Sequence, residues 1–160
     1  MGAGLLIVAV VVGIFLFPGT SGSVAQVGSN TKMVEVDVMA RGLTVLNPEQ
    51  FMADMKEDTK TSIIIRNQPY GEVDLLDVQP LPRSPAVPQP DGSVESFPDP
   101  RPELGFTADM LITLGGEAQI TDNGPVFGNS NVKIGTPIEL DGTLYNFKAS
   151  TVAVRILEDE

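Results

Sequence analysis

The chain has 160 residues, with 10 Lys and Arg against 21 Asp and Glu, and a formal net charge of −11. It contains no His and no Cys, which excludes structural zinc sites, disulfides, cysteine nucleophiles and Ser-His-Asp triads. The acidic balance also argues against a nucleic-acid partner, because phosphate contacts need clustered Lys and Arg.

The N-terminal region is free of charge. Residues 1–31 carry no charged side chain, and residues 1–17 are continuously apolar. As a helix they would span about 25 Å, slightly less than the roughly 30 Å hydrocarbon core of a bilayer. We favour a transmembrane anchor over residues 1–18. The alternatives are a signal peptide cleaved before Gln26, which would lack its basic n-region, and a buried helix, which would lack a polar stripe. Residues 19–32 are small, polar and glycine-rich, which predicts a flexible tether.

The next segment, residues 33–78, reads as a β-rich half-domain. The alternation of valines with acidic residues over residues 34–38 predicts a half-buried strand. Asn47 before Pro48 is a helix-start signal, so a short helix is expected over residues 48–55. Two further strands are predicted over residues 61–67 and 72–78, with a turn at residues 68–71.

Residues 79–103 form a proline-rich strap that holds 8 of the 13 prolines. Such a sequence favours polyproline II over helix or central strand. It fits a semi-rigid spacer, the use we favour, or a docking segment for an aromatic groove. The Asp91-Gly92 turn, followed by Val94 and Phe97, suggests that part of the strap packs on the domain.

Residues 104–157 repeat the order of the first half. A strand over residues 106–114 is expected to end at Gly115-Gly116, and strands over residues 133–140 and 146–156 follow. Residues 61–70 and 136–145 both begin Thr-x-Ile and end in Tyr.

The predicted fold is therefore mainly β: an N-terminal transmembrane helix followed by a small β-barrel-like domain, residues 33–157. Two pseudo-repeats (33–78 and 104–157) and one short helix build this domain, and barrel closure would hide the strand edges. The residues expected to be buried are Val34, Val36, Val38, Ile64, Ile134 and Val154.

Few residues suggest chemistry. Glu35 and Asp37 share a strand face and could hold calcium weakly, but acids opposite alternating valines are usually solvated. A Ser–Lys dyad is the only nucleophile arrangement left, and no spacing favours any of its candidates: Ser62, Ser130 and Ser150 with Lys60, Lys133 and Lys148. We name no catalytic, cofactor-binding or metal-ligating residue and predict that the protein is not an enzyme.

Several stretches together resemble a known family. They are GIFLFPGTSGSVAQVG, VEVDVMARGL, IIIRNQPYGEV, VPQPDGSVESFPDPR and VKIGTPIELDGTLYNFKASTVAVRI. The chain resembles DUF4330, a family of uncharacterised bacterial and notably cyanobacterial membrane-anchored proteins. Members usually carry further residues, some of them basic, before the apolar span, so the resemblance implies a truncated or miscalled start. It also implies a cytoplasmic N-terminus and a β domain on the periplasmic or lumenal side of the plasma or thylakoid membrane.

Two functions follow as hypotheses. The first is a non-catalytic accessory or scaffold protein associated with a photosynthetic or other membrane complex. The second is a membrane-tethered domain that binds or transfers lipid or another apolar ligand. A real apolar pocket would favour the second, and a filled barrel with an exposed apolar patch would favour the first.

Overall fold

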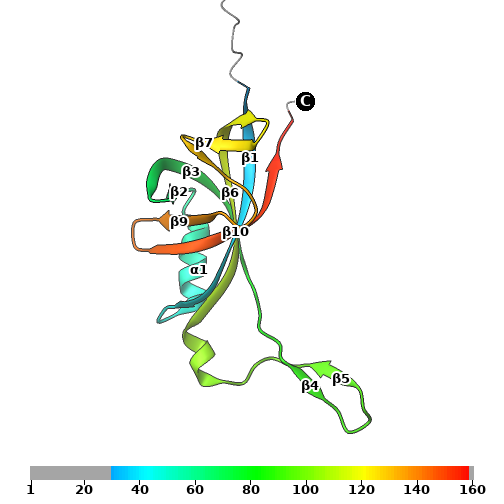
Figure 1. Cartoon of the computed structure of the whole chain (residues 1–160). Helices are drawn as coiled ribbons and strands as arrows, with labels where there is room; N and C mark the ends of the chain where they lie inside the picture. The colour runs from blue at the N-terminus through cyan, green and yellow to red at the C-terminus, as the bar shows by residue number, and fades with distance from the viewer. Residues whose placement is uncertain (1–29, 159–160) are drawn as a thin grey trace, which may run out of the picture.

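The computed structural model describes residues 30–158 and shows a closed antiparallel β-barrel with a separate two-stranded hairpin at one end (Figure 1). The large sheet has the order β1-β10-β9-β2-β3-β6-β7-β8, and an additional pairing of β1 with β6 closes its first six strands into a barrel. The elements are β1 (Thr31–Thr44), α1 (Pro48–Glu57), β2 (Lys60–Ile65), β3 (Gln68–Pro80), β4 (Ala86–Pro88), β5 (Val94–Ser96), the 3-10 helix η1 (Pro102–Phe106), β6 (Thr107–Thr121), β7 (Gly124–Phe127), β8 (Ser130–Asn131), β9 (Pro137–Asp141) and β10 (Asn146–Ile156). The prediction of a mainly β barrel with one short α-helix is confirmed.

Strand β1 forms because its apolar residues alternate. Val34, Val36, Val38 and Ala40 are all buried, while their neighbours point outward. The strand pairs with β10 along one edge and with β6 along the other, so both of its edges are covered. The first two residues of β1, Thr31 and Lys32, were assigned to the tether, but both pair with β6.

Helix α1 begins where the sequence indicates. The Asn47 side chain accepts a hydrogen bond from the Gln50 amide at 3.4 Å, and Pro48 occupies the first turn. The helix lies against the barrel and buries Met55 fully, while Phe51 and Met52 pack partly against the core. It extends slightly beyond the predicted end at residue 55.

The barrel interior is filled by side chains. The largest fully buried residues include Met110, Ile112, Ile138 and Leu140. The space left between the walls beside Phe127 is about 10 Å³, which is roughly what a single water molecule needs. This space is too small to hold a ligand.

Two tyrosines pack against aromatic neighbours and donate hydrogen bonds from their hydroxyls. Tyr70 packs edge-on against Phe127 with ring centroids 5.3 Å apart, and its hydroxyl donates to the Glu117 carbonyl at 2.8 Å. Tyr145 packs against Phe51 and Phe147 and donates to the Thr61 hydroxyl at 3.1 Å. Burial raises the pKa of both phenols.

Three sequence-based strand boundaries were wrong. Strand β6 continues through Gly115-Gly116 instead of ending there. Strand β9 begins at Pro137, so Ile134 lies in the preceding loop and is 73% exposed instead of buried. The turn between β2 and β3 is formed by Arg66 and Asn67, with φ of 51° and 63°, the left-handed pair typical of a tight hairpin.

The buried set was otherwise partly correct. Val34, Val36 and Val38 are fully buried, whereas Ile64 and Val154 are half-buried. Ile64 faces outward because its neighbours Ile63 and Ile65 take the inward positions of β2. A barrel strand buries only its inward face, so three consecutive isoleucines cannot all be buried there.

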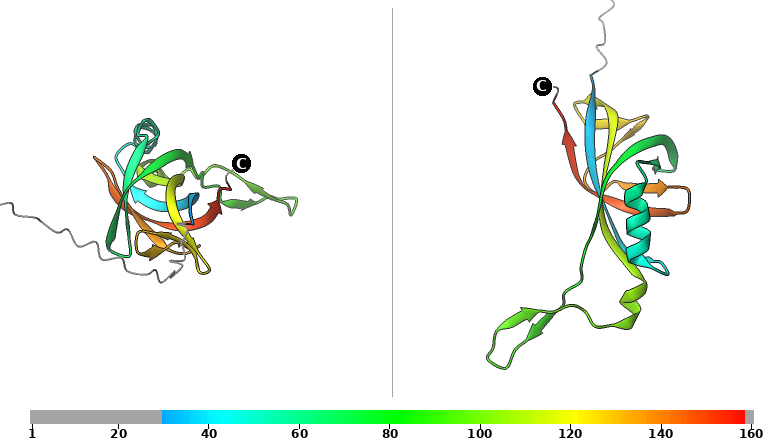
Figure 2. Two further views of the ribbon diagram at one scale, coloured as in Figure 1. Left: turned by 90° about the horizontal axis from the view of Figure 1, so that it is seen from above. Right: turned by 180° about the vertical axis from the view of Figure 1, so that it is seen from behind.

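The two ends of the barrel differ. The C-terminus and the start of β1 lie at one end, and β4 and β5 project from the opposite end (Figure 2). Within residues 30–158, no helix has the length and apolarity needed to cross a bilayer. The predicted anchor, residues 1–18, and most of the tether, residues 19–32, lie outside the described residues.

Candidate functional site

The proline-rich strap contains a projecting hairpin, which we call the arm (residues 81–99). Strands β4 and β5 pair antiparallel with Val87 opposite Glu95. The ladder continues toward the barrel, where the Phe97 amide donates to the Pro85 carbonyl and the Asp99 amide to the Arg83 carbonyl, both at 3.3 Å. The strap is therefore a β-ribbon over much of its length, not polyproline II.

A tight turn closes the tip of the arm. Asp91 accepts hydrogen bonds from the amide and the hydroxyl of Ser93, at 2.9 and 2.6 Å. Gly92 has φ of 84°, a conformation that favours glycine. The bonds from Ser93 hold the pKa of the Asp91 carboxyl below its usual range.

The outer part of the arm, which carries Val94 and Phe97, does not pack on the barrel, contrary to the sequence-based expectation, and only its base contacts β6. All six residues of β4 and β5 are exposed. The exposed fractions are 38% for Val87, 64% for Val94 and 44% for Phe97. These apolar side chains therefore form an exposed surface on the arm. An isolated two-stranded ribbon is only marginally stable in water.

A buried carboxylate fixes the base of the arm. Asp109 of β6 is 9% exposed and binds the Arg83 guanidinium through two hydrogen bonds. The same carboxylate accepts the Gly42 amide at 2.6 Å, and the Leu81 amide donates to the Asp109 carbonyl at 2.8 Å. Hydrogen bonds from Arg83 hold the pKa of Asp109 below its usual range, and this effect exceeds the opposing effect of burial.

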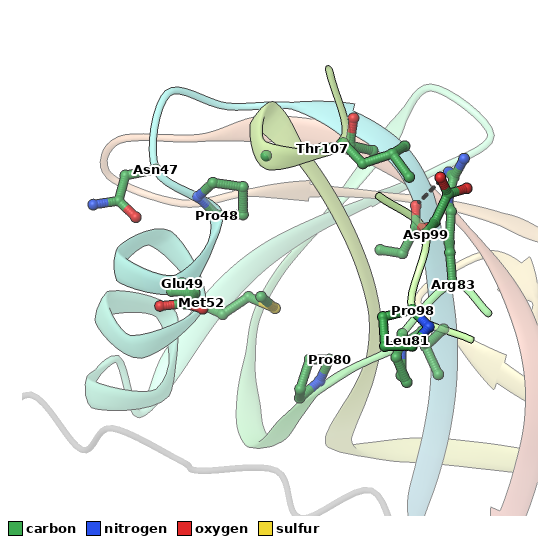
Figure 3. A pocket seen from close by; sticks show the side chains of 14 residues that line it. Asn47, Pro48, Glu49, Met52, Pro80, Leu81, Arg83, Pro98, Asp99 and Thr107 are labelled. Carbon is green, nitrogen blue, oxygen red and sulfur yellow. Dashed lines mark hydrogen bonds and ion pairs between the residues drawn. The ribbon is translucent and has the colours of Figure 1, made fainter. Parts of the chain in front are cut away.

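An open groove of about 520 Å³ lies between α1 and the base of the arm (Figure 3). Its walls are largely apolar, with polar groups at the rim. The lining residues include Met52, Pro80, Leu81, Pro98 and Leu104, with Asn47, Glu49 and Asp99 among the polar ones. A second open pocket of about 360 Å³ shares Arg83, Asp99 and Asp109 with the groove and is also lined by Arg41 and Arg101.

The residues weighed for metal binding and catalysis do not converge. Glu35 and Asp37 both face Arg155, in ion pairs of 3.1 and 2.5 Å. None of the serine and lysine candidates is hydrogen-bonded to another within residues 30–158. In the same part of the chain, no group of three or more Asp and Glu could hold a metal ion.

The sequence reading missed the base of the arm as a site. Arg41 of β1 is distant in sequence from Arg83, Arg101 and Asp109, and the pairing of β1 with β6 brings it to them. The available signal was modest: Arg83 and Arg101 both lie inside the proline-rich strap.

The match to a protein family covers residues 1–155 and is described as a domain of unknown function (DUF4330). The chain belongs to this family. The resemblance drawn from the sequence stretches is thereby confirmed. No curated protein and no solved structure matches the chain. The DUF4330 assignment names no activity, so the functional argument depends on the geometry of the arm and its base.

Proposed function

We propose that this DUF4330 protein is a non-catalytic, membrane-anchored accessory or scaffold protein that docks onto a membrane complex through its arm. The proposed anchor is residues 1–18, and residues 19–29 link it to the barrel. The proposed location of the β domain is the periplasmic or lumenal side of the plasma or thylakoid membrane. A photosynthetic or other bioenergetic complex is the proposed class of partner.

The exposed arm is the observation that carries this proposal. It presents Val87, Val94 and Phe97 to solvent, and among residues 30–158 no further strand pairs with either of its outer edges. It also projects from the end of the barrel opposite the start of β1 (Figure 2). An anchor joined to β1 would leave the arm on the side of the domain away from the attachment point.

The alternative, a lipid-binding or lipid-transfer domain, has less support. The interior space of about 10 Å³ leaves no room for an acyl chain. The groove at the arm base is open and interrupted by charged residues. A filled barrel with an exposed apolar surface favours docking over ligand storage.

The test is site-specific photo-crosslinking in native membranes. A photoreactive residue at position 94 is expected to capture one defined membrane complex at constant stoichiometry. The matched control is position 134, because Ile134 is equally apolar and 73% exposed but lies in the loop before β9, outside the arm. Capture from both positions, or of a stoichiometric lipid from position 94, would contradict the scaffold role.

We also infer that the two halves of the barrel are duplicated units. The support is a pseudo-two-fold pattern of pairing. Strands β1 and β6 pair with each other, as do β2 and β9, and each half contributes a long strand and a hairpin. The ladders are interrupted at equivalent residues, Leu76 of β3 and Val152 of β10. The inferred two-fold axis passes through the Ile63–Leu140 pair. It makes Thr61 equivalent to Ile138, whereas the Thr-x-Ile comparison of the two sequences aligned Thr61 with Thr136.

A further inference from the structure

Three of the five arginines gather in one pocket at the arm base, which we call the arginine pocket. Arg41 comes from β1 and Arg83 from the part of the arm before β4. Arg101 comes from the segment between the arm and η1. The chain as a whole carries a net charge of −11. The arginine pocket therefore reverses the sign of charge that prevails over the molecule.

The two carboxylates of the arginine pocket are shielded, and the guanidinium groups are not. The Asp109 and Asp99 side chains are 8% and 7% exposed, whereas their partners Arg83 and Arg101 are 41% and 57% exposed. Asp109 already accepts hydrogen bonds from the Arg83 side chain and the Gly42 backbone amide. Asp99 accepts hydrogen bonds from the side chain and the backbone amide of Arg101. The pocket therefore presents positive groups to solvent.

The three arginines retain unused donors. Arg83 and Arg101 each use Nε and Nη2 for their aspartate, and Nη1 makes no hydrogen bond within residues 30–158. Arg41 forms no ion pair there, and its one hydrogen bond runs from Nε to the Met39 sulfur at 3.3 Å. Arg155, in contrast, uses all three nitrogens on Glu35 and Asp37. A guanidinium with a free edge binds a carboxylate well, because its planar donors match the two oxygens.

We propose that the arginine pocket receives a carboxylate from an acidic, extended segment of the protein that docks on the arm. This inference rests on the proposed scaffold function and specifies the chemistry of its partner. A protein segment fits because both outer strand edges of the arm beside the pocket are unpaired within residues 30–158, and extended segments recognise such edges. A polyanion such as a nucleic acid fits poorly, because phosphate contacts need many clustered Lys and Arg, and two of these three arginines already pair with an aspartate.

The first experiment measures the arginine Nε–H signals of the full-length chain in detergent micelles by ¹⁵N NMR. The probes are a capped tetraglutamate peptide, a capped tetraglutamine peptide and inorganic phosphate. Saturable shifts of the Arg83 and Arg101 signals with tetraglutamate alone are expected. No saturable shift up to about 10 mM, where millimolar binding would be near saturation, would overturn the proposal. Equal shifts with tetraglutamine would overturn it too, and so would shifts with phosphate alone.

A matched pair of variants locates the effect. Arg41→Gln removes the one pocket arginine without an ion pair and leaves the pairs of Asp109 and Asp99 intact. It is expected to weaken tetraglutamate binding about tenfold. Arg66→Gln, in the exposed turn between β2 and β3, removes the same charge elsewhere and is expected to leave the affinity unchanged. If both variants weakened tetraglutamate binding equally, the effect would come from net charge alone, and the proposed binding site would be overturned.

A second experiment separates this inference from the scaffold function. The crosslink from position 94 is measured in the Arg41→Gln background. Reduced capture of the complex, with capture retained in Arg66→Gln, supports the arginine pocket as part of the interface. Unchanged capture in both variants would overturn the acidic partner while leaving arm docking intact. Failure of the unsubstituted arm to capture a complex would instead reject the scaffold function itself.

Discussion

Two neighbouring isoleucines of β2 have opposite environments. Ile63 is 3% exposed inside the barrel, whereas Ile64 is half-buried on the outer wall opposite Glu139. Ile63→Ala is expected to lower the free energy of unfolding by about 2–5 kcal/mol, because it leaves a cavity in a packed interior. Ile64→Ala should cost about 1 kcal/mol, since its surroundings can relax into solvent. Urea denaturation measures the free energy of unfolding of both variants. Equal losses of stability would contradict the assignment of Ile63 to the interior and Ile64 to the outer wall.

The outer wall carries a charged cluster that makes stability depend on pH. Hydrogen bonds from Arg155, and a smaller one from Thr113, hold the pKa of Asp37 below its usual range despite partial burial. A lowered folded-state pKa stabilises the fold above the unfolded-state value of about 4, and the contribution is lost as pH falls through the lowered pKa.

Asp37→Asn is therefore expected to destabilise the protein at pH 7 and to have a much smaller effect near pH 2. Chemical denaturation at both pH values measures the difference. Asp122→Asn is the control, because Asp122 is exposed and makes no ion pair within residues 30–158. A destabilisation by Asp37→Asn that is the same at both pH values would reject the electrostatic origin.

Strand β6 runs through two glycines because the barrel walls approach closely there. A Cβ on Gly116 would lie 3.1 Å from the Phe127 ring and 3.2 Å from a Val73 methyl group. Gly116→Ala is expected to cost about 1–3 kcal/mol through overpacking. Gly105→Ala in η1, where a Cβ meets no atom within 4 Å, should be nearly neutral. Thermal unfolding compares the two, and similar melting temperatures would contradict the close-packing argument.

These glycines also show what sequence reasoning could and could not predict. The alternation in β1 and the Asn47-Pro48 start of α1 are local signals, and both elements form where expected. Gly115-Gly116 is locally a strand breaker, and only its neighbours across the barrel explain why the strand continues. Tertiary contacts therefore override local propensity at this position.

The hairpin of the arm could not be predicted from the sequence for a related reason. Its prolines suggest polyproline II, but Pro85 supplies the ladder only with its carbonyl, so the missing amide costs no hydrogen bond. Val94 and Phe97 are apolar, which suggested packing on the barrel. The arginine pocket was equally hidden, because Arg41 and Arg83 meet only once β1 and the arm lie on either side of Asp109.

At the scale of the whole molecule, the barrel separates the stabilising core from the proposed docking surface. Its filled core provides stability, and its two ends carry the start of β1 and the arm respectively (Figure 2). The arm adds exposed apolar surface without adding to the core, since none of the buried core residues lies in β4 or β5. Stability and docking should therefore respond to different substitutions.

Replacing residues 85–97 with a Gly/Ser linker of equal length tests this separation. The replacement keeps Arg83, so the ion pair with Asp109 and the base of the arm persist. The midpoint of thermal unfolding is expected to change by no more than about 2 °C, because surface changes outside a core usually shift stability by under about 0.5 kcal/mol. Capture of the membrane complex, measured by a general amine-reactive crosslinker in native membranes, is expected to be lost. A large fall in the unfolding midpoint would mean that the arm supports the barrel, and unchanged capture would place the docking surface elsewhere.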